Sequence, residues 1–153
     1  IWALCARLWG HKYGFLNWPR LYWGLLLGCN LVRFKSPKGQ LMPQKQRLFT
    51  ILVSTSMHLI WRLRNKRHFE NSEQTITSTE IHNRWVAAMN WTLKRDHLFT
   101  SKIHFGRLAL NRHTVLRTWS GTLWDEDSLP DDWIQSDRVL VGIRPLSTKS
   151  GVG

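Results

Sequence analysis

Residues 46–69 read QRLFTILVSTSMHLIWRLRNKRHF, and this stretch carries the clearest helical periodicity in the chain. Its apolar side chains recur every three or four residues, which places them in a wide stripe along one face of a helix. A stripe of this width predicts a long amphipathic helix that buries one face in a hydrophobic core. The positions in the stripe are Leu48, Phe49, Leu52, Val53, Met57, Leu59, Ile60 and Leu63.

A second long helix is predicted over residues 78–98. Thr77 and Glu80 match a capping box, in which the Thr side chain accepts hydrogen bonds from first-turn amides and the Glu reaches back. Apolar side chains then recur at helical spacing as far as Leu93. The expected fold class is therefore mainly α, built on two long amphipathic helices at 46–69 and 78–98.

Shorter helices are expected on either side of these two. Residues 2–9 carry an apolar helical face, and Pro19 suits the first turn of a short helix that ends near Leu27. Another short helix is expected over 108–119, where a Ser-Gly pair then stops it.

Composition divides the chain into four parts. Two prolines and a glycine lie among cations at residues 34–45 and predict a loop. The acidic residues gather near the carboxyl end, in a turn-rich stretch whose apolar residues 139–143 suggest a short strand or an extended surface segment. The parts are Trp-rich short helices at 1–33, a basic loop at 34–45, a helical core at 46–119 and an irregular acidic tail at 120–153.

The net charge of the chain is +12, and the excess is unevenly distributed. Residues 1–70 hold twelve basic residues and one acidic residue, whereas residues 119–153 hold three basic and six acidic residues. A basic body of this kind suits a polyanionic partner, either nucleic acid or an anionic membrane surface. The simpler interpretation, that the charge only keeps the chain soluble, stays open.

Candidate nucleic-acid contacts cluster at the carboxyl end of the first long helix. Cations there favour the negative end of the helix dipole, which explains part of the cluster, but four cations in six residues exceed that need. The indole of Trp61, which adjoins this cluster, is able to stack on a base. A second cationic patch lies near the end of the other long helix. The candidates are Trp61, Arg62, Arg64, Lys66, Arg67, Lys94 and Arg95.

The ten tryptophans allow two interpretations. Trp61, Trp85 and Trp91 lie on or beside basic helical segments, where an indole is able to stack on a base or on an arginine. The second interpretation, favoured for most of the tryptophans and extended to Trp85, is that they fill the core of a small domain. The tryptophans assigned to the core are Trp2, Trp9, Trp18, Trp23, Trp85 and Trp119.

No enzyme is predicted from these residues. Six of the ten carboxylates fall between Asp125 and Asp137, whereas two-metal catalysis draws carboxylates from distant elements. Cys5 and Cys29 form no short pair of the kind that zinc sites use, and the histidines are scattered. Neither a nucleophile elbow nor a phosphate-binding glycine loop is present in the sequence. We expect no catalytic residues, no metal, no cofactor and no small-molecule substrate.

An intracellular location, in the nucleus or cytoplasm, is expected. The two cysteines suggest no disulfide framework, and the sequence shows no credible signal peptide. The most apolar run, residues 21–32, is too short to span a bilayer. A membrane-surface role for residues 18–33 ranks last, because the apolar residues there lack a clean polar counter-face. Since the chain begins at Ile1, it is expected to be a piece of something longer.

The amino-acid sequences of several segments resemble the carboxyl-terminal end of fungal LINE-like (non-LTR) retrotransposon polyproteins. Residues 47–67 resemble a segment near that end, residues 80–85 the next block, and residues 118–133 a later one. Residues 139–143 resemble the closing residues, and the stretch around residues 27–29 is similar to the region before these blocks. Together the blocks cover most of the chain in the expected order.

The resemblance implies a place in a polyprotein that carries reverse transcriptase and ribonuclease H domains. The catalytic aspartates of those domains and the Cys/His-rich segment that often precedes this tail have no matching positions here. The expected function is thus a non-catalytic accessory fragment that helps hold RNA or an RNA–DNA hybrid and contacts upstream domains of the same polyprotein. Two alternatives remain open: a scaffold packed on the ribonuclease H or polymerase domain, and a decayed element remnant with no function of its own.

Overall fold

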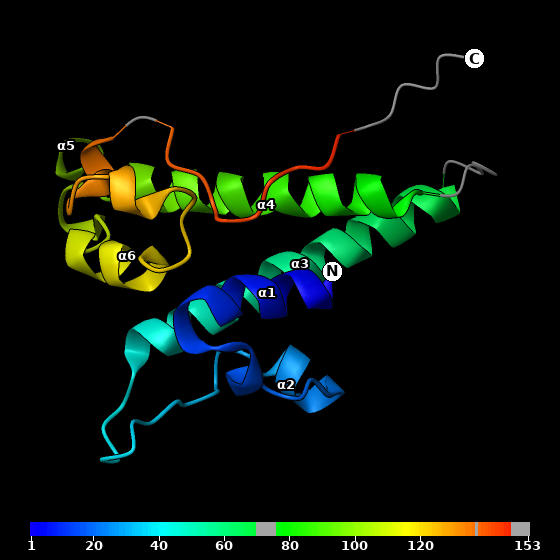
Figure 1. The fold of residues 1–153 in the computed structure, drawn as a ribbon, viewed down its shortest axis with the longest axis horizontal. Helices are drawn as coiled ribbons and strands as arrows, with labels where there is room; N and C mark the ends of the chain where they lie inside the picture. The colour runs from blue at the N-terminus through cyan, green and yellow to red at the C-terminus, as the bar shows by residue number, and fades with distance from the viewer. Residues whose placement is uncertain (70–75, 137, 148–153) are drawn as a thin grey trace.

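Helices make up most of the computed structural model, which describes residues 1–69, 76–136 and 138–147 (Figure 1). Within these ranges β-structure is limited to two isolated antiparallel bridges, Lys35 with Leu41 and Leu123 with Val141. The predicted mainly-α class is therefore confirmed. The helices are α1 (Trp2–Tyr13), α2 (Trp23–Leu27), α3 (Pro43–Phe69), α4 (Ser78–Leu98), α5 (Lys102–Phe105) and α6 (Arg112–Trp119). The 3₁₀ turns are η1 (Phe15–Asn17), η2 (Gly106–Leu108), η3 (Glu126–Ser128) and η4 (Trp133–Gln135).

Both predicted long helices are present. The bounds of α4 match the prediction, and Thr77 Oγ1 accepts the Glu80 amide at 3.1 Å, whereas the Glu80 carboxylate turns to Arg84 instead of reaching back. The start of α3 was placed three residues late, because Pro43 occupies the first helical turn, where its missing amide hydrogen is not needed.

Of the short helices, α1 extends to Tyr13, beyond the predicted 2–9, whereas α2 and α6 are shorter than expected. α2 begins at Trp23, after three residues outside any helix that follow Pro19. α6 begins at Arg112 because the Asn111 side chain caps it, accepting the Thr114 amide at 3.2 Å.

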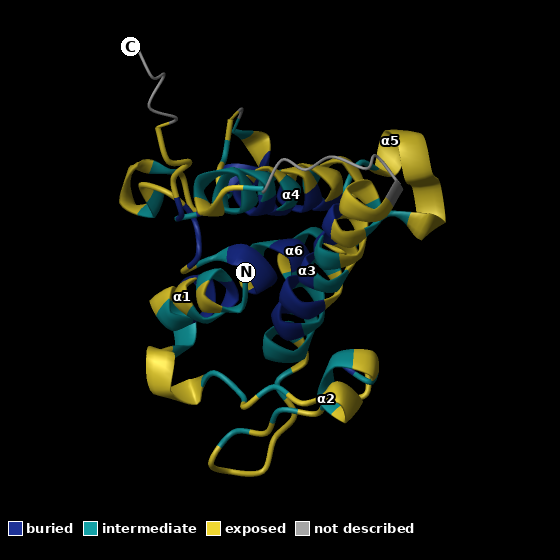
Figure 2. Ribbon diagram, turned by 90° about the vertical axis from the view of Figure 1, so that its right-hand side faces the viewer, coloured by how far each residue is buried: buried dark blue, intermediate teal, exposed yellow. Residues whose placement is uncertain are grey.

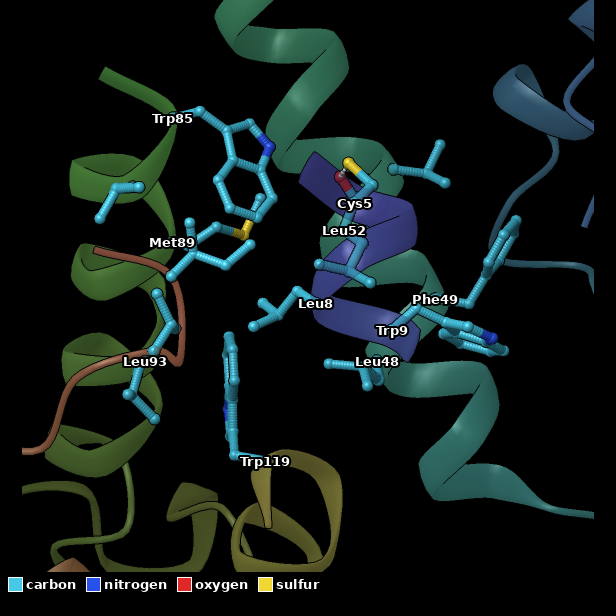
Figure 3. Close-up of a cluster of buried hydrophobic side chains, with 14 of the residues drawn as sticks. Cys5, Leu8, Trp9, Leu48, Phe49, Leu52, Trp85, Met89, Leu93 and Trp119 are labelled. Atoms are coloured by element: carbon cyan, nitrogen blue, oxygen red, sulfur yellow. Dashed lines mark hydrogen bonds between the residues drawn. The ribbon is translucent and has the colours of Figure 1, made fainter. Parts of the chain in front are cut away.

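The long helices α3 and α4 pack side by side, with α1 against α3 and α6 in contact with both α3 and α4 (Figures 1 and 2). One hydrophobic cluster fills the space between these four helices. Figure 3 shows Leu8 of α1 and Leu52 of α3 pointing toward Met89 of α4, with the Trp119 ring of α6 closing one side.

The predicted core role is confirmed for Trp9, Trp85 and Trp119, which have no exposed surface. Trp2 and Trp18 are half-buried at the edge of the core. Trp23 was assigned wrongly, since 74% of its surface is exposed. It lies on α2, which is too short to turn every apolar side chain inward.

The carboxyl-terminal segment packs along α4. Trp133, Ile134, Val141 and Ile143 are at most 3% exposed and belong to the common core. Two side chains of α4 hold the backbone of this segment. Asn90 Oδ1 accepts a hydrogen bond from the Val141 amide at 2.8 Å. Asn83 bonds to Leu146 twice: its Oδ1 accepts from the Leu146 amide at 2.7 Å, and its Nδ2 donates to the Leu146 carbonyl at 2.9 Å.

A buried carboxylate joins three helices. Asp96 of α4 is 4% exposed, and its Oδ2 accepts a hydrogen bond from Trp119 Nε1 of α6 at 2.8 Å. Nη1 of Arg47 in α3 lies 2.8 Å from the same oxygen without hydrogen-bond alignment, so this contact is a charge pair. Removing one partner from such a group leaves a buried charge or donor uncompensated.

We therefore expect Asp96→Ala to lower the free energy of unfolding by about 3 kcal/mol. Asp96→Asn should cost less, because its amide oxygen still accepts from Trp119. Urea unfolding monitored by tryptophan fluorescence measures both. Asp127→Ala, at an exposed position, is the control and should stay within about 0.5 kcal/mol of the unmutated chain; an equal effect of both alanine variants would contradict the role of Asp96.

Lys12 ties α1 to the end of α6. Its ammonium group donates to the carbonyls of Arg117 and Thr118, which lie in the last turn of α6. The pKa of Lys12 is lowered to about 8, mainly by burial; the charge of Glu126 raises it, and the charge of Arg117 has a smaller lowering effect.

This shift in the Lys12 pKa predicts a pH dependence of stability. Between pH 8 and 10 the folded chain has released a proton that Lys12 still binds in the unfolded chain, so the contribution of Lys12 to the free energy of unfolding rises with pH. The raised pKa of Cys5, about 11, opposes this trend from about pH 9, and that of Tyr13, about 12, from about pH 10; both effects are common to the unmutated chain and to a Lys12 variant. We expect the difference in unfolding free energy between the unmutated chain and Lys12→Met to grow in favour of the unmutated chain over this range. Urea titrations at pH 7, 8, 9 and 10 measure it, and parallel pH profiles would contradict it.

Candidate nucleic-acid interface

The predicted cationic cluster surrounds the end of α3 instead of covering one face. Arg62, Arg64, Lys66 and Arg67 are all exposed in the last turns of this helix. Positions three and four apart share a helix face, whereas positions two apart do not. Arg62 therefore shares a face with Lys66, while Arg64 shares another with Arg67.

A groove of about 720 Å³ runs between α3 and α4 beside the first of these faces. It brings together Arg62 and Arg95, which were predicted separately at the ends of two helices. The lining residues are Ser54, Thr55, His58, Leu59 and Arg62 from α3, and Arg84, Ala87, Ala88, Trp91, Thr92 and Arg95 from α4.

Helical spacing explains why these side chains converge. His58 and Arg62 are four residues apart on α3, and Arg84, Trp91 and Arg95 are spaced by seven and four residues on α4. Each set therefore lies on one side of its helix. Small side chains at Ala87 and Ala88 keep the groove open between them.

The lining of the groove is cationic. It holds three arginines and no carboxylate. Glu80, one turn before Arg84, pairs with it at 2.6 Å, and both side chains are more than a third exposed. A pair of this kind contributes only about 0.5 kcal/mol, so an incoming anion can replace it at little cost.

Two exposed indoles accompany these cations. Trp91 is 63% exposed on the groove wall, and the Arg95 guanidinium lies 5.5 Å from its ring. Trp61 is 59% exposed and stacks on His58 at 5.8 Å between ring centres, so it borders the groove through a lining residue.

Trp85 does not belong to this surface. It is fully buried, and its Nε1 donates to Ser56 Oγ at 2.8 Å. The same hydroxyl lies 3.0 Å from Cys5 Sγ. Burial raises the pKa of the Cys5 thiol to about 11 and also raises that of Cys29, so both thiols stay protonated near neutral pH.

Lys94 lies apart from Arg95. It lines a second groove, of about 620 Å³, which runs between α4 and residues 133–136 and 138–140 and also contains Arg138. The predicted patch at Lys94 and Arg95 therefore splits, with Trp91 on the ridge between the two grooves.

Sequence reasoning did not include His58 or Arg84 among the candidates, and it left Trp91 without a defined place. The signal that could have found Arg84 and Trp91 is their seven-residue spacing, continued by four residues to Arg95. A helical wheel of residues 78–98 puts all three on one side. The facing wall of the groove comes from α3. This could not be predicted, because the packing of α3 on α4 leaves no signal in the local sequence.

In the part of the chain that the structure describes, no three His, Cys, Asp or Glu side chains lie where they could share a metal ion. Among the same residues, every helix is too short or too polar to cross a membrane. Comparison with protein families, curated proteins and solved structures gives no match to this chain.

Proposed function

We propose that this chain is a non-catalytic accessory piece of a retroelement polyprotein that helps to hold RNA or an RNA–DNA hybrid. The retroelement context rests only on the sequence resemblance of residues 47–67, 80–85, 118–133 and 139–143, together with the stretch around residues 27–29. The binding role rests on one observation, the groove between α3 and α4 lined by three arginines, His58 and the exposed Trp91, without a carboxylate.

The chemistry of the groove suits a phosphate backbone. Guanidinium groups donate in a planar fork that matches phosphate oxygens, and they remain charged at any physiological pH. Arg62 and Arg84 stand on opposite walls, so a strand lying in the groove meets cations from both sides. The wider charge of the chain, which has no acidic residue from Ile1 to Phe69, adds long-range attraction.

The test is binding to fluorescein-labelled single-stranded RNA and to an RNA–DNA hybrid across a salt series. We compare two double variants of equal charge, Arg62→Gln with Arg95→Gln inside the groove, and Arg64→Gln with Arg67→Gln outside it. The groove variant should weaken binding more, and its slope of log affinity against log salt should flatten by about 1.4 for single strands.

Equal effects of the two double variants would show that net charge, and not the groove, governs binding. Absence of salt-dependent binding by the unmutated chain would refute the proposed function. Thermal unfolding of each variant checks that the fold is retained.

A scaffold role is the second candidate, and a specific feature favours it. Trp23 and Leu27, one turn apart on α2, are 74% and 77% exposed, and Leu31 in the following turn is 71% exposed. Exposed apolar side chains gathered in this way are typical of a protein contact surface. In the polyprotein context, the partner would be the ribonuclease H or polymerase domain.

For the scaffold role we expect Trp23→Ser with Leu27→Ser to weaken binding to purified ribonuclease H or polymerase domains of fungal non-LTR elements by at least about tenfold. Calorimetric titration measures this effect. Ile103→Ser with Leu108→Ser, two side chains about 90% exposed near α5, is the matched control and should bind like the unmutated chain. No binding by the unmutated chain would count against the scaffold.

A further inference from the structure

We propose that the groove between α3 and α4 is built for an unpaired strand, with a base stacked on Trp91 and the phosphates held by Arg62, Arg84 and Arg95. This inference rests on the proposed nucleic-acid function and specifies its ligand as single-stranded nucleic acid, in preference to a duplex or hybrid.

The exposed indole is the first reason. Trp91 has 63% of its surface exposed although it lies on the wall of a groove between two packed helices. Contact between a large aromatic ring and water is unfavourable, and a ligand that covers the ring removes this cost. Base faces are available for stacking only when the base is unpaired and unstacked, as in single strands.

The shape of the groove is the second reason. α3 and α4 are in direct contact, and in the core Trp85 Nε1 donates to Ser56 Oγ at 2.8 Å. The groove has a volume of about 720 Å³, the size of a pocket for a small ligand, so it takes a few nucleotides of one strand and not a double helix. A duplex would rest on the rim and touch the arginines through one backbone, with its bases kept from Trp91.

The order of the side chains is the third reason. Arg84 and Arg95 are eleven residues apart on α4, or about 16 Å along the helix axis, and Trp91 lies between them. This arrangement alternates phosphate contacts with a stacking platform. A span of this length suits a short tract of roughly four nucleotides, at the lower end of known single-strand sites.

Arg95 contributes in two ways. Its guanidinium lies 5.5 Å from the Trp91 ring, a cation–π contact that holds it beside the indole. From there it reaches the phosphate next to a stacked base. Arg84, at the other end, exchanges its exposed Glu80 partner for a phosphate.

The chain contains a matched control for the indole. Trp124 is 41% exposed, and the Arg144 guanidinium lies 3.6 Å from the centre of its ring. It therefore reproduces an exposed indole beside an arginine, but it does not line the groove.

The experiment measures affinities of the full 153-residue chain for a ten-nucleotide oligouridylate, the matching oligodeoxythymidylate and a ten-base-pair RNA–DNA hybrid at one salt concentration. We expect both single strands to bind more tightly than the hybrid. Trp91→Ala should lower single-strand affinity by roughly five- to a hundredfold and leave hybrid affinity nearly unchanged. Trp91→Phe should restore most of the loss, and Trp124→Ala should have no effect.

Salt-dependent binding with equal affinity for strand and hybrid, or with no effect of Trp91→Ala, would overturn this inference while leaving the proposed function in place. Absence of binding to all three probes would overturn both. Because Trp91 is largely exposed, its replacement should leave the urea unfolding curve unchanged, and that curve is recorded for each variant.

Discussion

The packing of α3, α4 and α6 depends most on the contacts of one buried carboxylate, that of Asp96. It accepts from Trp119 of α6 and faces Arg47 of α3, so one side chain of α4 sets the position of two other helices. A buried charge tolerates few alternative registers, because any slip of α3 along α4 leaves it without its partners. We infer that Asp96 fixes how α3 and α4 align, and thereby which side chains line the groove between them.

The two sides of α4 are used differently. On one side, Asn83 and Asn90 hold the backbone of the carboxyl-terminal segment, which covers the helix and adds Val141 and Ile143 to the core. The side that carries Arg84, Trp91 and Arg95 has no such cover within the described residues. Because the asparagine amides bond to backbone, the covering does not depend on the acidic side chains of that segment. Among the described residues, Asp132 forms an ion pair with Arg112, and the charge of Glu126 acts on Lys12 of α1.

Local patterns predicted the two long helices and the Thr77 cap, because periodicity and capping depend on neighbours in the sequence. They could not predict the burial of Asp96 or the core role of Trp133, since both depend on elements far away in the chain. Trp133 stands among acidic turn residues, where no helical or strand period shows it to be apolar and inward-facing. The candidate site was predicted in part for the same reason. Arg62 and Arg95 follow from composition, whereas their meeting in one groove follows only from the packing of α3 on α4.

The number of cations along the sequence and their arrangement in space point to different binding surfaces near the end of α3. The run from Arg62 to Arg67 is the densest group of cations, yet the helix spreads it over opposite faces. Around Arg62, Arg84 and Arg95 the linear density is low, but three cations and an exposed indole share one concave surface. Affinity for a flexible polyanion depends on total charge, whereas discrimination between a strand and a duplex depends on shape and stacking. In the proposed nucleic-acid role, the groove is therefore the part of the molecule that would distinguish a single strand from a duplex.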